Sequence, residues 1–335
     1  MKKYFVTLFL SVFCFVVQVS AQSSVLATLF HEGEVSIFSG STALRQAHAA
    51  ATHGDVITLS GGSFMSVDIT KAVTIRGAGM EMSETQAMPT IITGDFTINV
   101  TDSVSQRLII EGIFHNQDLD YENVPSNSLF LKCRLKSLEY RSSSSKMPNA
   151  SFIHCKITEE FRLGGTESTA SIINCVIRGL RVGNHNCGIE VYNSLVMISD
   201  YWIYNLVFNN CILFKYSSDS MTNFMAYNCI GYSYAGNDIF LDIPNSTNIM
   251  VDDLSTVFKT YQGQDTDKLD SEKFELTDEA KSKYIGADGT QVGIYGGSLP
   301  FDPTTTNPQI VKCNVAGKST ADGKLSVDIE VKAAE

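Results

Sequence analysis

The stretch SIINCVIRGL, residues 171–180, recurs along the chain in a recognisable form. SFIHCKITEE begins at residue 151, VFNNCILFKY at 207 and MAYNCIGYSY at 225. Each copy has a polar residue, most often Asn, directly before a Cys. Each also has an apolar residue three positions before that Cys. The chain therefore repeats one short unit.

Aligning the copies on the Cys position gives a period close to 20 residues. The aligned residues are Cys133, Cys155, Cys175, Ser194, Cys211 and Cys229, at spacings of 22, 20, 19, 17 and 18. A fixed period of this length indicates a solenoid. The runs between these marks are rich in strand-forming residues and lack helical periodicity. We therefore predict an all-β fold: a right-handed parallel β-helix with about three short strands in each coil.

The polar residue before the Cys predicts a sharp bend between two strands. It is Lys132, His154, Asn174, Asn193, Asn210 and Asn228 in turn. Asn tolerates left-handed backbone geometry, and stacked Asn side chains can hydrogen-bond one another. The Cys behind it is small and suits the core. Two arrangements fit these cysteines: stacked free thiols, or disulfides between adjacent coils.

Both ends of the repeat have their own signatures. In TALRQAHAAATHGDVITLSGG, residues 42–62, Leu44, Ala47 and Ala51 fall along one face of an amphipathic helix over about 42–53. We expect this helix to cap the N-terminal end of a β-helix that spans residues 22–300. A charged insert over about 261–289 precedes the closing coil.

Residues 301–335 read as a Pro/Thr linker followed by a β-hairpin tail. QIVKCNVAG and KLSVDIEVKA alternate in polarity, and Asp322-Gly323 between them marks a turn. A lone hairpin is marginally stable in water. The tail is therefore expected to dock on the last coils, to pair with a partner, or to be the stub of an immunoglobulin-like module.

The helix, the segments GDVITLSGGSF and KAVTIRGAG, and the Asn-Cys coils together resemble the pectin-lyase-like parallel β-helix superfamily. DGTQVGIYGG, residues 288–297, is similar to the segment that closes many such secreted helices. The resemblance covers about residues 36–300 and extends to uncharacterised secreted bacterial β-helix proteins. Lyases, hydrolases, epimerases and adhesins share this architecture, so the resemblance implies the fold rather than an activity.

Residues 1–21 have the pattern of a signal peptide. Lys2 and Lys3 precede an apolar core, and Val19 and Ala21 suit a cleavage site. We expect export to the periplasm, the cell surface or the medium, with no membrane insertion after cleavage. The mature chain would carry 23 basic and 36 acidic residues, a formal net charge of −13. This balance argues against nucleic acid as a partner.

Few residues suggest catalysis or metal binding. The hydrolases that share this architecture use an Asp-Asp pair and a His-Gly pair on successive coils. Here Asp252-Asp253 and His53-Gly54 lie at opposite ends of the predicted rod, so they cannot form one site. In HNQDLDYEN, the side chains of Asp118, Asp120 and Glu122 would point the same way and could bind Ca²⁺. A solvated loop is the alternative, and no other cofactor is expected. The arginines of successive coils could meet an acidic sugar, although outward Arg is ordinary: Arg134, Arg141, Arg162, Arg178 and Arg181.

Aromatic residues suggest a glycan-binding surface. The candidates are Tyr201, Trp202, Tyr216 and Tyr234, which fall on successive coils. Stacked outward, their rings would offer apolar faces to sugars. Stacked inward, they would belong to the core.

These patterns favour a non-catalytic, adhesin-like exported protein. Its long face would bind a polysaccharide or a cell-surface protein. A polysaccharide lyase acting on acidic glycans is one alternative. A structural rod whose tail serves as an assembly element is the other.

Overall fold

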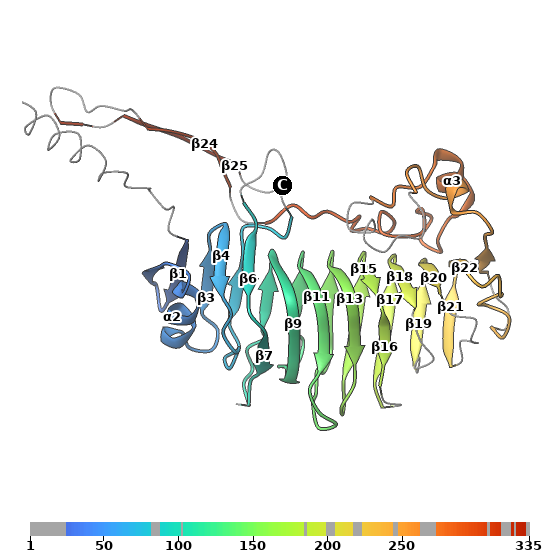
Figure 1. Ribbon diagram of the computed structural model, residues 1–335, viewed down its shortest axis with the longest axis horizontal. Helices are drawn as coiled ribbons and strands as arrows, with labels where there is room; N and C mark the ends of the chain where they lie inside the picture. Colours follow the sequence, from blue (N-terminus) through green and yellow to red (C-terminus); the bar gives the residue numbers. More distant parts are fainter. Residues whose placement is uncertain are drawn as a thin grey trace, which may run out of the picture.

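The computed structural model describes residues 25–81, 88–101, 103–183, 186–198, 205–216, 223–243, 247–261, 273–306, 309–315, 323–324 and 326–332 of the 335-residue chain. The predicted signal peptide lies outside the described residues. The described residues form a parallel β-solenoid of about 9 turns, and the coils stack into an elongated rod (Figure 1). The predicted β-solenoid is therefore confirmed.

Sheet A runs along one side of the rod and contains eleven strands. All neighbours pair in parallel except β1, which is antiparallel to both β2 and β3. The spatial order is β2 (Glu34–Ser39), β1 (Leu26–His31), β3 (Val56–Leu59), β5 (Thr74–Arg76), β8 (Ile109–Glu111), β10 (Leu129–Leu131), β12 (Ala150–Ile153), β14 (Thr169–Ile173), β17 (Gly188–Tyr192), β19 (Leu206–Asn209) and β21 (Phe224–Tyr227).

Sheet B contains twelve strands. Its order is β4 (Gly62–Met65), β6 (Thr90–Thr93), β9 (Ile113–Asn123), β11 (Arg134–Tyr140), β13 (Lys156–Leu163), β15 (Val176–Arg178), β18 (Leu195–Ile198), β20 (Ile212–Lys215), β22 (Ile230–Ser233) and β23 (Ile249–Met250), with β7 (Phe96–Asn99) beside β9 and β16 (Leu180–Val182) beside β13. The pairing of β11 shifts register between Leu135 and Ser137. The second halves of β9, β11 and β13, with β7 and β16, are called the third face below.

From β8 onward, sheets A and B meet at a one-residue corner with left-handed backbone geometry. These corner residues are Gly112 (φ 63°), Lys132 (52°), His154 (53°), Asn174 (48°), Asn193 (45°), Asn210 (55°) and Asn228 (53°). Left-handed geometry costs most L-residues about 1–2 kcal/mol, and Asn visits it more readily. The predicted bend is confirmed, and it holds even where Lys or His replaces Asn. We call this set the corner column.

The residue after each corner points into the core. At five corners this residue is a buried, free cysteine: Cys133, Cys155, Cys175, Cys211 and Cys229. Cys187, outside this column, is also buried and free, so the described cysteines are thiols and not disulfides. The backbone N–H of Cys155 donates to Cys175 Sγ at 3.2 Å, and that of Cys175 donates to Ser194 Oγ at 3.0 Å. The Cys position therefore supplies an acceptor for the preceding coil, a role that Ser194 fills equally well.

The interior on either side of this column is apolar, as the repeat predicts. The rings of Phe130 and Phe152 stack at 4.5 Å with 6° between their planes. Two positions after the Cys, the coils have an aliphatic residue, but the last of these coils has Gly231. A Cβ at Gly231 would lie 2.5 Å from the ring of Phe240, which fills that space at the end of the stack.

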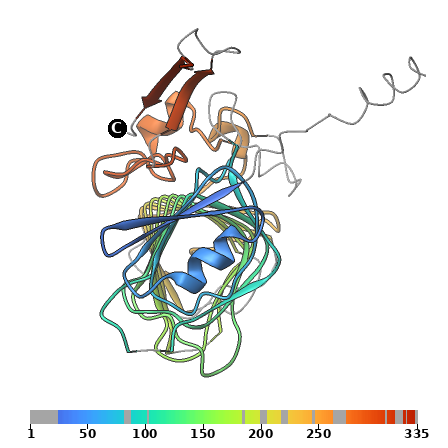
Figure 2. The ribbon, with the colours of Figure 1, turned by 90° about the vertical axis from the view of Figure 1, so that its left-hand side faces the viewer.

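Helix α2 (Ala43–Ala50) lies within the ring of strands at the N-terminal end of the stack (Figure 2). It buries Ala43, Leu44 and Ala47 in the main core. This is the face that the sequence pattern selects. At the other end of the stack, Phe240 joins the same core together with Ile239 and Ile243.

After β23 the chain folds back over the outer face of sheet B. This outer layer includes the 3-10 helix η1 (Leu254–Thr256) and helix α3 (Asp278–Lys283). Outward side chains of sheet B, such as Met197 and Phe214, form a second core with Phe258 and Leu276 of this layer. The described part of the charged insert therefore contributes to packing, since it supplies Leu276.

Residues 285–306, here called the return segment, then run back along the corner column (Figure 1). Asn210 Oδ1 accepts from the N–H of Ala287 at 3.1 Å. Two coils closer to the N-terminus, Asn174 Nδ2 donates to the carbonyls of Ile294 and Gly296, at 2.7 and 2.8 Å.

The contacts continue toward the N-terminal coils. His154 Nε2 lies 3.0 Å from the carbonyl oxygen of Leu299, and Lys132 Nζ lies 3.0 Å from Asp302 Oδ2. Thr306 Oγ1 donates to Glu111. The side chains of four corner residues therefore bond to the return segment: Lys132, His154, Asn174 and Asn210. The sequence suggested bonds between stacked Asn side chains instead. Residues 288–297 lie beside the coils and do not form a closing coil.

The tail contains the antiparallel pair β24 (Gln309–Val315) and β25 (Val327–Lys332). In Figures 1 and 2 this hairpin stands clear of the coils. The preceding linker does pack: Phe301 is buried, and its ring lies edge-on to His154 at 5.9 Å.

We predict that Asn174→Ala destabilises the protein more than Asn228→Ala does. Both variants put Ala in left-handed geometry, at a cost of about 1–2 kcal/mol. Only Asn174→Ala also leaves two carbonyls of the return segment without their donor, which adds about 1–3 kcal/mol. Urea unfolding measures both losses. Equal losses would show that the return segment gains no stability from the corner column.

We also predict that Cys175→Ser is tolerated better than Cys175→Ala. Ser retains an acceptor for the N–H of Cys155, as Ser194 does one coil later. Ala leaves that buried N–H unpaired, at about 1–3 kcal/mol. Thermal unfolding of the two variants tests this order. A serine variant as unstable as the alanine variant would contradict it.

Candidate functional site

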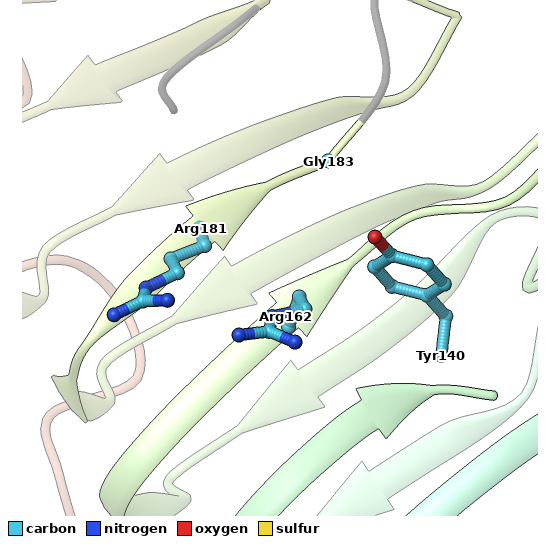
Figure 3. Close-up of a pocket in the computed structure, with 4 residues that line it drawn as sticks. All are labelled: Tyr140, Arg162, Arg181 and Gly183. Carbon is cyan, nitrogen blue, oxygen red and sulfur yellow. The ribbon is translucent and has the colours of Figure 1, made fainter. Parts of the chain in front are cut away.

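A pocket of about 260 Å³ opens on the third face. It is lined by Tyr140 at the end of β11, Arg162 on β13, Arg181 on β16, and Gly183. Figure 3 shows both arginines on adjacent strands, with Tyr140 standing apart from their guanidinium groups. Pockets that bind drug-sized ligands measure about 300–1,000 Å³, so this smaller pocket suits a group such as one sugar ring.

Carboxylates hold the two arginines in place. Arg162 Nη1 lies 3.2 Å from Glu139 Oε2, and Arg162 Nη2 lies 2.9 Å from Glu160 Oε1. Arg181 Nε lies 2.9 Å from the same Glu160 oxygen. Glu160 therefore joins both guanidinium groups. All four side chains are 20–32% exposed, so the network is fixed but reaches solvent.

The register of the strands puts these residues in one row. Thr97 pairs with Asp120, Asp120 with Glu139, Glu139 with Arg162, and Arg162 with Arg181. Successive coils lie about 4.8 Å apart. This charge row has two carboxylates at one end and two guanidinium groups at the other, so it offers acceptors and donors along the rod axis.

The acidic end of the charge row is partly buried. Burial raises the pKa of Glu139, and Arg162 opposes that rise. Burial likewise raises the pKa of Asp120, against the opposing charge of Arg141. Carboxyls perturbed in this way gather at functional sites more often than elsewhere, although structural ion pairs perturb them too.

The predicted calcium ligands lie on β9 next to this row. Asp118, Asp120 and Glu122 point outward, as alternation predicts, while the residues between them are buried. Lys136 Nζ lies 3.3 Å from Asp118 Oδ1, and Arg141 Nε lies 3.5 Å from Glu122 Oε1. Across the described part of the chain, no group of three or more His, Cys, Asp or Glu side chains is arranged to hold a metal ion. Calcium binding stays a prediction.

Two of the four predicted glycan-binding aromatics are described. The rings of Tyr216 and Tyr234 stack at 4.5 Å with 11° between their planes, and the Tyr234 hydroxyl lies 2.7 Å from that of Tyr261. Burial raises the pKa of both Tyr216 and Tyr234. Tyr201 and Trp202 lie outside the described residues. In the described pair, each ring already covers one face of the other.

The remaining arginines do not join the pocket. Arg141 lies on the third face and donates to Thr97 Oγ1 at 3.0 Å. Arg134 lies over the Phe114 ring, 4.8 Å from its centroid, and Arg178 donates to the carbonyl of Thr158. Only Arg162 and Arg181, of the arginines that sequence analysis considered, come together.

Sequence reasoning did not select Tyr140, Glu139 or Glu160. Glu139 lies six residues after Cys133, and Arg181 lies six residues after Cys175, so equal offsets from the repeat mark relate these two residues. Arg162 lies seven residues after Cys155, so the same signal does not place it between them.

Comparison with known proteins gives no match to any family model, curated protein or solved structure. The structure itself defines the class of the protein, which is a parallel β-solenoid. None of the helices in its described portion has the length and apolar character needed to cross a membrane.

Proposed function

We propose that this chain is an exported, non-catalytic protein that binds an acidic glycan on its third face. In this proposal residues 1–21 direct export, the β-helix is right-handed and pectin-lyase-like, α2 is its N-terminal cap, and the hairpin is a separate tail. The protein acts in the periplasm, at the cell surface or in the medium, in the manner of an adhesin.

The observation that carries the proposal is the pocket formed by Tyr140, Arg162 and Arg181. A guanidinium group has five N–H donors in a planar fork that fits a carboxylate. Arg162 has more donors than its contacts with Glu139 and Glu160 use. A uronate carboxylate can therefore bind at the basic end of the charge row.

The rest of the charge row supplies contacts for a neutral part of the same glycan. Asp120 and Glu139 are acceptors for sugar hydroxyls, one coil apart along the rod. The ring of Tyr140 provides an apolar wall next to Gly183. The formal net charge of −11 for the whole chain disfavours non-specific attraction of polyanions, so binding depends on this local arrangement.

We predict that Arg162→Gln/Arg181→Gln weakens binding of an acidic polysaccharide at least tenfold. Each lost charge-assisted hydrogen bond contributes about 1.5–3 kcal/mol. Calorimetry with a panel of uronate-containing polysaccharides measures this effect. Arg107→Gln is the matched control, because Arg107 is exposed and does not line the pocket.

Thermal unfolding shows whether each variant remains folded. Equal binding by the double variant and Arg107→Gln would overturn the proposed site. Formation of unsaturated sugar products by the unmodified protein would instead identify a polysaccharide lyase.

A further inference from the structure

The two edges of sheet A have unusual exposed surfaces. Within this sheet, all of whose strand residues are described, the exposed large hydrophobic side chains lie only in β1, β2 and β21. They are Leu26, Phe30, Val35 and Ile37 at one edge, and Met225 and Tyr227 at the other. The eight strands between these edges contribute none. Val35 and Ile37 are 63% and 68% exposed.

These edges also have compatible strand directions. β2 is antiparallel to β1, and β1 is antiparallel to β3. β2 therefore runs in the same direction as β3 and the strands that follow, up to β21. A second copy placed head to tail would set its β2 parallel to β21 of the first copy, which continues sheet A in its existing pattern.

The alternation of side chains on β2 fits this pairing. Val35 and Ile37 lie opposite Phe30 and Thr28 of β1, on the outer side of the sheet. Ser36 lies opposite Leu29, on the inner side.

On β21 the exposed residues Met225 and Tyr227 are on the outer side, and the buried Ala226 is on the inner side. Val35 can then lie beside Met225, Ile37 beside Tyr227, and Ser36 beside Ala226. Apolar side chains then meet on the outside. On the inside Ser36 meets Ala226, and Glu34 lies beside Phe224.

Edge strands in soluble proteins are usually protected by Lys, Pro or a bulge. β2 has no Lys, Pro or bulge; its one charged residue is Glu34 at the start of the strand, and all but one of its six residues are exposed. At β21 the protection comes from two side chains. Asn248 Nδ2 donates to the carbonyl of Ala226 at 2.8 Å, and Thr247 Oγ1 and Asn248 Oδ1 accept from the N–H groups of Asn228 and Cys229 directly after the strand, at 2.9 and 2.8 Å. An incoming strand would have to displace these side chains.

We propose that the protein assembles with further copies of itself, head to tail, through pairing of β2 with β21. A second copy is the occupant for which the structure supplies both surfaces. A two-fold dimer through β2 alone would leave Met225 and Tyr227 exposed. A head-to-tail contact uses a different surface on each copy, so it does not close after two copies and builds an open filament. This assembly does not depend on glycan binding.

Analytical ultracentrifugation of the mature chain, residues 22–335, tests the proposal from micromolar to millimolar concentration. The average mass should rise several-fold without levelling off at a dimer. Val35→Lys/Ile37→Lys and Met225→Lys/Tyr227→Lys should each remain monomeric. These four side chains are exposed, so Lys is compatible with the fold. Leu299→Lys, at an exposed position away from both edges, should assemble like the unmodified protein.

Mixing the two double variants gives the decisive result. Each retains one intact edge, so the mixture should form a heterodimer and no larger species. A monomeric unmodified protein at all concentrations would overturn the proposal. So would a dimer that Val35→Lys/Ile37→Lys abolishes and Met225→Lys/Tyr227→Lys does not.

Discussion

One left-handed residue between sheets A and B sets the geometry of the coils. It turns the chain within a single residue, so the side chain that follows always points into the core. Asn meets this constraint at the lowest cost, and a small Cys or Ser fits behind it. Because each coil from β8 onward starts again from this corner, equivalent residues stay close to one another along the rod. Alignment of Glu139, Arg162 and Arg181 in the charge row also needs the register shift between β11 and β13, because Arg162 lies one residue further from its corner than the other two.

The corner column also determines which surfaces remain available. Its side chains fix the return segment, and the outer layer covers the outer face of sheet B with a second core. That face cannot be a binding surface for a large ligand where it is covered. The third face has the pocket, and the outer face of sheet A ends in exposed apolar edges. The two proposals therefore concern separate surfaces of one rod.

The coils were predictable because their signal is periodic. The Cys position, its polar neighbour and the buried positions on either side could all be read from a spacing near 20. The return segment could not, because its contacts are not periodic and join residues such as Asn174 and Ile294, which are 120 positions apart. The pocket was only partly predictable: Arg162 and Arg181 were candidates, but the register shift between β11 and β13 hid the alignment of Arg162 with Glu139. The partner of Tyr234 was missed similarly, since Tyr261 comes from the chain beyond the last coil.

The measurement that tests the glycan-binding account most directly is hydrogen exchange of the mature chain with and without a uronate oligosaccharide. Binding at the pocket should slow exchange in residues 134–140, 156–163 and 180–183, where the charge row and Tyr140 lie. Residues 205–216 and 223–234 should be unaffected. Protection confined to those later coils would contradict the account and place the ligand at Tyr216 and Tyr234.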